Sequence, residues 1–131
     1  MAAILLDTTV VIDLLRGRSE AVRRLRGLRD AGDTPCVCAV NVEETVRGLR
    51  PAETDPASRL FRGLRVVPLG EREGRQAGEW RREHAARGLT LAQADCLVAA
   101  AALSIGGRLA TANMKDFPMP GLTVEHWPAG A

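Results

Sequence analysis

The stretch from Asp95 to Phe117, DCLVAAAALSIGGRLATANMKDF, constrains the fold more than any other part of the chain. It begins with an acid, runs apolar to Gly106 and Gly107, and continues as a strand-like segment, 108–111, and a polar loop. A helix that is apolar nearly all round is normally buried, and a glycine pair can end it in a left-handed turn. The stretch therefore predicts a buried helix, a strand and a loop. The acid at the helix start needs compensation from the helix dipole or from a cation.

In the N-terminal segment, too, an acidic residue lies at one end of a predicted buried element. Residues 3–6 form a short apolar run, Asp7 follows directly, and a helix is predicted for 8–16. The run is too short to cross a membrane and lacks the basic start of a signal peptide, so no membrane association is expected. If strands 3–6 and 108–111 are parallel neighbours, Asp7 and Asp116 share the sheet edge at which α/β proteins bind ligands.

The rest of the chain alternates predicted strands and helices. Asn41, Asp55 and Thr90 are expected to cap helices, Thr90 together with Gln93 as a capping box. The order predicts an α/β fold with a mainly parallel central sheet and helices on both faces, in a single domain of residues 1–131. The further strands are expected at 36–40, 65–68 and 122–127, and the further helices at 19–32, 41–48, 55–63, 71–87 and from 93 onward.

Composition limits the class of protein. Aromatic residues make up 3% of the chain and apolar residues 46%, so aliphatic side chains must build the core. The 18 basic residues exceed the 16 acidic ones by only two, and Lys115 is the single lysine among them. Arginine suits bidentate phosphate contacts, but a GC-rich genome would also favour arginine over lysine. Cys36, Cys38 and Cys96 lie in apolar stretches, which predicts buried, reduced thiols in a cytoplasmic protein, and they make a poor zinc site.

Three motifs together resemble the PIN-domain ribonucleases and, within them, the VapC-type toxins of bacterial toxin–antitoxin pairs. The motifs are LLDTTVVIDLLRG at the start, VEETVRGL in the middle and DCLVAAAALSIGGRLATANMKDF near the end, in the family's order and at about its spacing. The resemblance implies a PIN-like three-layer α/β/α fold and a metal-dependent endoribonuclease that uses Mg²⁺, with Mn²⁺ as a substitute. It also implies a structured RNA substrate such as tRNA, a VapB-type antitoxin as inhibitor, and a homodimer.

The resemblance also implies which residues form the acidic site. Asp7 and Asp95 are expected to bind the principal metal ion, and Asp116 to assist directly or through water. Glu44 is expected to hold a second ion or to orient the attacking water. The predicted supporting residues are Thr9, Thr111 and Asn113. The position matching Asn113 is acidic in some relatives, which leaves open whether Asn113 or Asp116 contributes more.

Glu44 has two interpretations. It lies three residues after Asn41, the spacing of a capping box, and from spacing alone that structural role is favoured. The family carries an acid four residues before a glycine in this helix, and Glu44 before Gly48 matches it, so the resemblance favours a role in the site. Glu43 would point about 100° away on the helix, so both acids cannot serve one site equally.

The chemistry of the four carboxylates points to hard cations. Acids gathered in one pocket repel each other and must bind protons or cations, and oxygen ligands select Mg²⁺ or Mn²⁺ over zinc. No Ser–His or Cys–His nucleophile pair is evident, and His84 and His126 are expected to be surface or packing residues. A basic approach that holds RNA phosphates is predicted from some of Arg16, Arg18, Arg23, Arg47, Arg81 and Arg82.

Three competing interpretations remain open from the sequence. A haloacid-dehalogenase-like phosphatase also begins with a strand that ends in Asp, but it requires a second acid where Thr9 stands and a downstream lysine that only Lys115 could supply. A catalytically inactive PIN-like RNA- or protein-binding module is the main alternative, although such modules usually lose one of the acids. Finally, the acids could be ordinary caps, with Asp7 in an Asx-turn.

Overall fold

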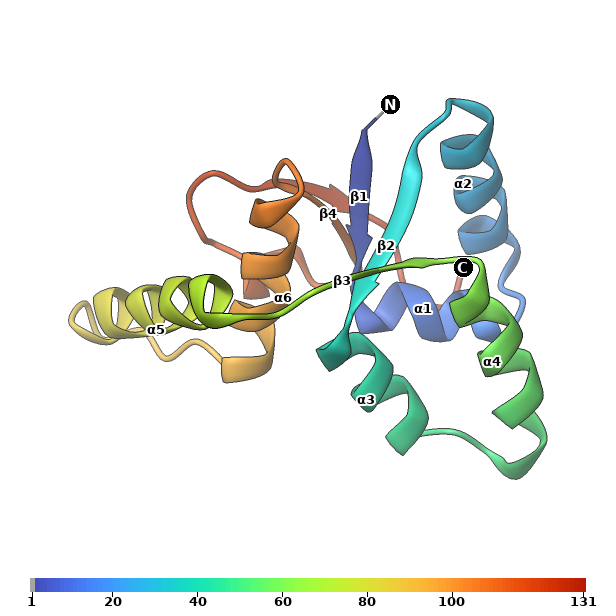
Figure 1. The fold of residues 1–131 in the computed structure, drawn as a ribbon, viewed down its shortest axis with the longest axis horizontal. Helices are drawn as coiled ribbons and strands as arrows, with labels where there is room; N and C mark the ends of the chain where they lie inside the picture. The colour runs from blue at the N-terminus through green and yellow to red at the C-terminus, as the bar shows by residue number, and fades with distance from the viewer. Residues whose placement is uncertain (1) are drawn as a thin grey trace.

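The computed structural model describes residues 2–131, and in this part of the chain the strands form one parallel sheet. Every strand pairing is parallel, and the order across the sheet is β3-β2-β1-β4-β5 (Figure 1). The carboxyl ends of all strands therefore meet at one edge. This confirms the predicted parallel sheet. The strands are β1 Ala3–Leu6, β2 Thr34–Cys38, β3 Arg65–Val67, β4 Arg108–Thr111 and β5 Thr123–His126.

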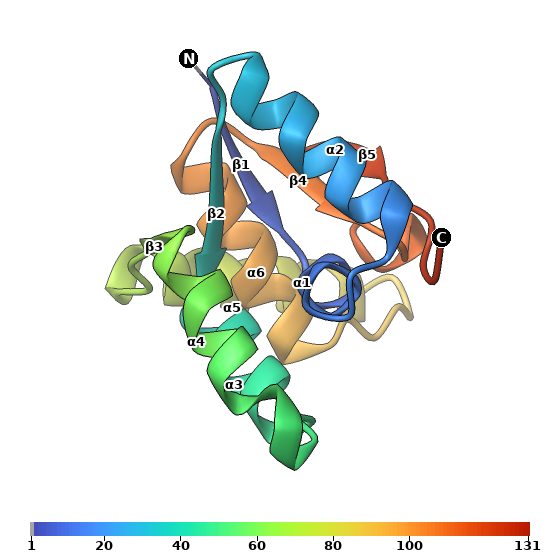
Figure 2. The same cartoon turned by 90° about the vertical axis from the view of Figure 1, so that its right-hand side faces the viewer.

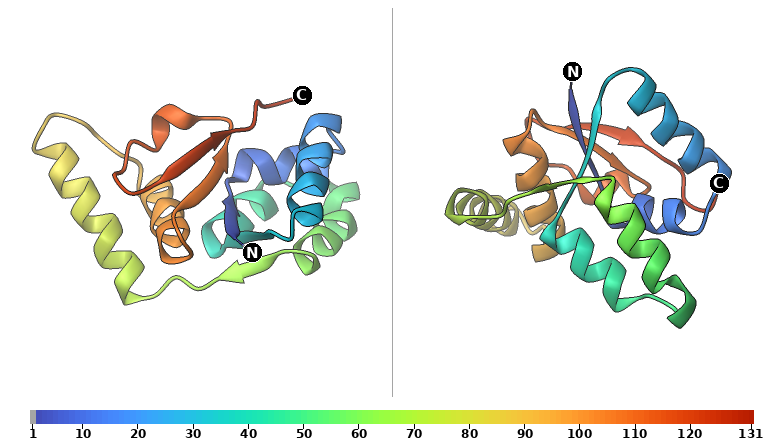
Figure 3. Two further views of the ribbon diagram at one scale, coloured as in Figure 1. Left: turned by 90° about the horizontal axis from the view of Figure 1, so that it is seen from above. Right: turned by 45° about the vertical axis from the view of Figure 1, so that its right-hand side comes forward.

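Helices cover both faces of the sheet, which confirms the three-layer α/β/α architecture. Helices α5 and α6 lie on one face and α1, α2 and α4 on the other, while α3 extends away from the carboxyl end of β2 (Figures 1 and 3). The helices are α1 Thr8–Leu15, α2 Ser19–Asp30, α3 Ala39–Arg47, α4 Thr54–Arg62, α5 Glu71–Ala85 and α6 Gln93–Ser104, with short 3₁₀ helices at Pro51–Glu53 and Met114–Asp116.

The sheet separates two apolar cores because successive side chains of a strand point to opposite faces. Leu5 packs in the core beneath α5 and α6, whereas Ile4 and Leu6 pack in the core beneath α1 and α2. Figure 2 views the fold with α1 and α2 toward the viewer and α6 behind the sheet. Each core contains one tryptophan, Trp80 in the first and Trp127 in the second. The two faces of the sheet are therefore packed independently.

Helix α6 is buried as the sequence predicts. Its residues 99–102 are all alanines and at most 3% exposed, so the helix can approach the sheet closely. Gly106 and Gly107 follow it with φ of +114° and +87°, and a Cβ on Gly107 would lie 2.7 Å from the carbonyl oxygen of Gly121.

The three cysteines are buried and free, in agreement with a packing role. Within residues 2–131, no helix is long and apolar enough to cross a membrane.

The predicted element boundaries agree within two residues, but the predicted caps at Asp55 and Thr90 are wrong, as is the one at Asn41, which is described with the site below. Helix α4 begins at Thr54 rather than after Asp55, and α6 follows Ala92 with no side-chain cap, so the Thr90 capping box does not form. Pro35 lies inside β2 instead of before it. The strand tolerates this proline because Thr34 N donates to Ala2 O toward β1, so the Pro35 nitrogen faces the other side, where pairing with β3 begins only at Cys36.

Candidate active site

Asp7 lies at the carboxyl end of β1, between the sheet and the first turn of α1. Its backbone N–H donates to Ala110 O of β4 at 2.9 Å, and the residue is only 7% exposed. The carboxylate accepts two hydrogen bonds, one from the Thr8 N–H to Oδ1 at 2.8 Å and one from Thr111 Oγ1 to Oδ2 at 2.7 Å. Asp7 therefore caps α1, as the structural interpretation expects, and its second oxygen is fixed from the end of β4.

Glu44 is held by Thr8 rather than by a capping box. Helix α3 begins at Ala39 after Cys38, so Asn41 is its third residue and not its cap, and the predicted Asn41–Glu44 capping box is wrong. Asn41 Oδ1 itself accepts from the Cys38 N–H at 2.9 Å. Glu44 therefore takes no part in a capping box, and its Oε1 accepts a hydrogen bond from Thr8 Oγ1 at 2.7 Å. The side chain of Glu44 is thus directed toward the helix that follows Asp7.

Asp95 and Asp116 complete the acidic group. Asp95 is in the first turn of α6, and Asp116 ends the 3₁₀ helix after β4. Burial, together with the charges of Asp116, Asp7 and Glu44, raises the pKa of Asp95 to about 6. Burial also raises the pKa of Asp7 against the opposing effect of its hydrogen bonds, with smaller contributions from Glu44 and Asp116. These charge effects place the four predicted carboxylates within electrostatic range of one another, and they are called the acidic group below.

The predicted supporting residues connect the loops around this group. Thr111 Oγ1 accepts from the Asn113 N–H at 3.0 Å while it donates to Asp7, and Thr9 Oγ1 accepts from the Ala112 N–H at 3.3 Å. Thr9 therefore ties α1 to the loop after β4 and does not contact an acid. Thr8, which sequence reasoning missed, makes that contact instead. The Asp-Thr-Thr motif names both residues but does not show which hydroxyl faces Glu44.

The acidic group has no cationic partner of its own. Within residues 2–131, none of the four carboxylates takes part in an ion pair. In the same residues, no three acidic, histidine or cysteine side chains are arranged closely enough to hold a metal ion as they stand. Uncompensated carboxylates, two of them with raised pKa values, are the donors that hard cations prefer. The donor chemistry therefore fits Mg²⁺ or Mn²⁺.

His84 and most of the predicted arginines have structural contacts, whereas His126 is exposed. His84 is buried, and its Nδ1 lies 2.8 Å from Trp80 O, so of the two predicted roles, surface or packing, it has the packing one. Exposed ion pairs are weak, so arginines in them can still turn toward a phosphate, and the basic approach stays a prediction. Four of the six arginines already have acceptors: Arg16 pairs with Glu53, Arg23 with Glu20, Arg47 with Glu43, and Arg81 donates to Leu91 O.

Comparison with known proteins places this geometry in a family. A family model described as the PIN domain matches residues 4–118. The chain belongs to the PIN domain family. Ribonuclease VapC10 of Mycobacterium tuberculosis is 34% identical to it over 116 residues, which cover 88% of this chain and 86% of the relative. Ribonuclease VapC19 of the same species is 28% identical over 115 residues, covering 88% and 92%. The resemblance to VapC-type PIN domains is confirmed.

Solved structures show the same PIN fold. The crystal structure of VapBC2 from Rickettsia felis bound to a promoter DNA fragment aligns with a TM-score of 0.85 at 20% identity, covering 95% of this chain and 98% of the matched one. The DNA-bound VapBC of Salmonella typhimurium aligns with a TM-score of 0.78 at 24% identity, covering 97% and 99%. At these identities the likeness concerns the fold.

Proposed function

We propose that this PIN domain is a VapC-type toxin that hydrolyses phosphodiester bonds in cellular RNA in a metal-dependent reaction. The observation that carries the proposal is the group of four carboxylates at the carboxyl edge of the sheet, none of which forms an ion pair within residues 2–131. The relatives named ribonucleases support the reaction class. The structured substrate, such as tRNA, and the cytoplasmic location belong to the same proposal.

We assign each residue of the site a role in the proposed reaction from its contacts. Asp7 and Asp95 hold the principal Mg²⁺ or Mn²⁺, with Asp116 assisting, and Thr111 keeps the Asp7 carboxylate in place. Such an ion supplies Lewis acidity and lowers the pKa of bound water. Glu44 would hold a second ion or orient the attacking water. The N-terminus of α6 adds a positive dipole end beside Asp95.

The partners follow from the neighbours. VapBC complexes contain an antitoxin, and we propose that a VapB-type antitoxin inhibits this chain and that the chain forms a homodimer. Co-expression with the antitoxin from the same operon, followed by purification and light scattering, tests both points. Failure of the two chains to copurify would contradict the antitoxin proposal, and a monomeric mass for the free protein would contradict the dimer.

The deciding experiment is cleavage of total RNA by the purified protein free of antitoxin. Discrete fragments should form with Mg²⁺ or Mn²⁺ and disappear with EDTA and in Asp95→Asn. Sequencing the fragment ends then identifies the RNA and the cleaved position. A folded protein that binds RNA but cuts none with either metal would instead support the inactive binding module.

A further inference from the structure

Asn41, Thr8 and Glu44 form a hydrogen-bond chain that starts at the end of β2 and ends on a carboxylate of the site. The Cys38 N–H donates to Asn41 Oδ1 at 2.9 Å, Asn41 Nδ2 donates to Thr8 Oγ1 at 3.2 Å, and Thr8 Oγ1 donates to Glu44 Oε1 at 2.7 Å. The chain joins the junction of β2 and α3 to Thr8 of α1, 33 residues away from Asn41 in the sequence. None of the residues in its middle has been given a role in the reaction above.

The direction of this chain is determined by its first donor. A backbone N–H can only donate, so the Asn41 atom beside Cys38 must be the carbonyl oxygen, and the NH₂ group must face Thr8. A threonine hydroxyl carries one proton, and because Asn41 already donates to it, that proton is left for Glu44. A hydrogen bond to an ionised acceptor is about twice as strong as a neutral one. The arrangement therefore presents a donor, and not a lone pair, to the Glu44 carboxylate.

Burial makes the start of the chain rigid. Asn41 is 0% exposed, and Cys38 ends a strand that pairs on both sides. The same pattern occurs at Asp7, where Thr111 accepts from a backbone N–H and donates to the carboxylate. Two acids of the group are thus each held by one threonine proton whose direction is imposed from a strand end.

We propose that Asn41 and Thr8 are positioning residues that orient the Glu44 carboxylate for the reaction. Thr8 engages Oε1, and within residues 2–131 no hydrogen bond reaches Oε2, which is left for an ion or for the attacking water. The inference rests on the proposed ribonuclease function. It assigns a specific task to the amide at position 41 and to the first of the two threonines after Asp7.

The test compares isosteric substitutions in two genetic backgrounds. Thr8→Val removes the hydroxyl at nearly constant volume, and Thr8→Ser restores it. Single-turnover cleavage should fall about 10- to 100-fold in Thr8→Val and stay near the wild-type rate in Thr8→Ser. In a Glu44→Gln background, Thr8→Val should cause little further loss, because the effect passes through Glu44.

Thr45 provides a matched control on α3, the helix that carries Glu44. It is 2% exposed and its hydroxyl has no hydrogen-bond partner among the described residues, so Thr45→Val should leave cleavage and folding unchanged. Thr8→Ala replaces Thr8→Val if the latter does not fold, as judged by circular dichroism. Solvent exchange of the Asn41 side-chain amide protons, followed by NMR, is a readout that does not depend on activity, and it should speed up in Thr8→Val.

The outcomes separate the two proposals. Wild-type protein that cuts no RNA contradicts the ribonuclease function, and the amide exchange then still tests the hydrogen-bond chain. If wild type cuts RNA and Thr8→Val cuts equally well, the positioning role is wrong. It is also wrong if Thr8→Val causes an equally large loss in the wild-type and the Glu44→Gln backgrounds, because Thr8 then acts without Glu44.

Discussion

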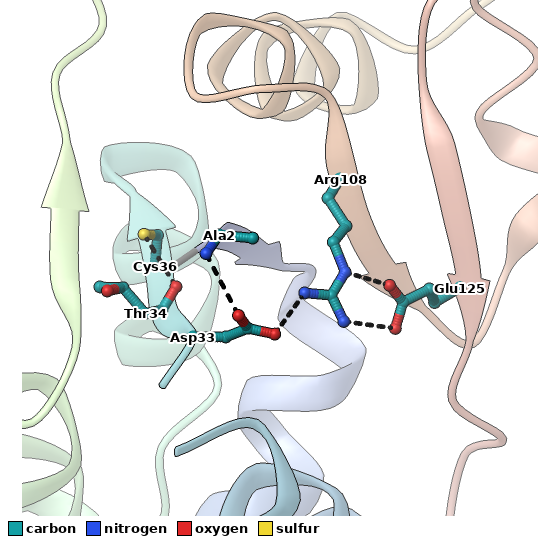
Figure 4. Close-up of polar contacts among 6 residues, drawn as sticks. All are labelled: Ala2, Asp33, Thr34, Cys36, Arg108 and Glu125. Atoms are coloured by element: carbon teal, nitrogen blue, oxygen red, sulfur yellow. Dashed lines mark hydrogen bonds and ion pairs between the residues drawn. The ribbon is translucent and has the colours of Figure 1, made fainter. Parts of the chain in front are cut away.

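The acidic side chains at the two edges of the sheet differ in whether an arginine pairs with them. At the amino edge, Arg108 of β4 lies between Asp33 and Glu125: its Nη1 donates to Asp33 Oδ2 at 2.7 Å, and its Nε and Nη2 donate to Glu125 (Figure 4). Asp33 also accepts from the Ala2 N–H at 3.2 Å. At the carboxyl edge the acids are gathered without an arginine. The acids at one edge pair with an arginine, and the four carboxylates at the other edge form no ion pair among residues 2–131.

The pKa values follow this division. The hydrogen bond from Arg108, with a smaller contribution from Ala2, lowers the pKa of Asp33, whereas burial and neighbouring acids raise the pKa of Asp95 to about 6. Charged groups that a protein does not neutralise cost stability and are typical of functional sites. The comparison therefore separates acids that serve the fold from acids that serve the proposed reaction.

The largest expected effect is the loss of activity in Asp7→Asn. Asparagine still caps α1, so the fold should persist, but the metal loses a charged ligand. Cleavage of the identified RNA should fall by at least about 1,000-fold, which corresponds to about 4 kcal/mol of transition-state stabilisation. Rate measurements beside thermal unfolding check both parts. A variant that folds and still cuts RNA would show that Asp7 is not a metal ligand, and loss of folding would favour the purely structural interpretation.

Arg108→Met should show the reverse behaviour at the amino edge. It removes the donor shared by Asp33 and Glu125 and leaves the two acids facing each other. We expect the free energy of unfolding to fall by about 2 kcal/mol in urea titrations, while the cleavage rate per folded molecule stays unchanged. A large loss of activity without loss of stability would mean that the two edges are not functionally separate.

Asp95→Asn should stabilise the metal-free protein near neutral pH. It removes one charge from a crowded, partly buried group, and after allowance for solvent screening we expect a gain on the order of 1 kcal/mol in EDTA. Addition of Mg²⁺ should stabilise the wild type more than the variant. Differential scanning calorimetry with and without Mg²⁺ measures both effects. A metal-free variant less stable than the wild type would argue that Asp95 supports the fold.

The smallest expected effect is a difference in pH dependence. The folded-state pKa of Asp33 is lowered, so its contribution to stability is present above the usual aspartate pKa of about 4 and is lost as the pH falls through its folded value. The folded-state pKa of Asp95 is raised, so in EDTA its protonated form favours folding at acid pH, and this is lost as the pH rises through about 6.

Unfolding curves of the wild type, Asp33→Asn and Asp95→Asn across the acid to neutral pH range distinguish these effects. The stability difference between wild type and Asp33→Asn should shrink toward acid pH. The advantage of Asp95→Asn should shrink there as well, because Asp95 is then protonated in both states. An Asp33→Asn curve parallel to that of the wild type at all pH values would show that the ion pair contributes no pH-dependent stability.

Sequence patterns predicted the elements that bury side chains and deliver acids. An apolar run followed by Asp7, and a second one ended by a glycine pair, leave few alternatives for how the chain folds locally, so the parallel sheet was predictable. The acids on β1, α3, α6 and the loop after β4 were placed through the family resemblance, which the family match confirms. That these acids act in catalysis and metal binding stays a prediction.

Capping and long-range contacts were less predictable. The expected caps at Asn41, Asp55 and Thr90 failed because a shift of one or two residues in a helix start changes which side chain reaches the free N–H groups. The partners of Thr8 and Arg108 lie 36 and 75 residues away, at Glu44 and Asp33. No local pattern encodes such contacts, since only the folded sheet brings them together.

The separation of the two cores gives the protein a built-in pair of optical probes. The sequence has no tyrosine and two tryptophans, and these are buried on opposite faces of the sheet, Trp80 at 3% exposure and Trp127 at 5%. Arg24 lies over the Trp127 ring at 5.9 Å, which gives that indole a distinct electrostatic environment. Trp80→Phe and Trp127→Phe each leave a single fluorophore that reports on one layer. Superimposable emission changes on denaturation would show that both layers melt as one cooperative unit.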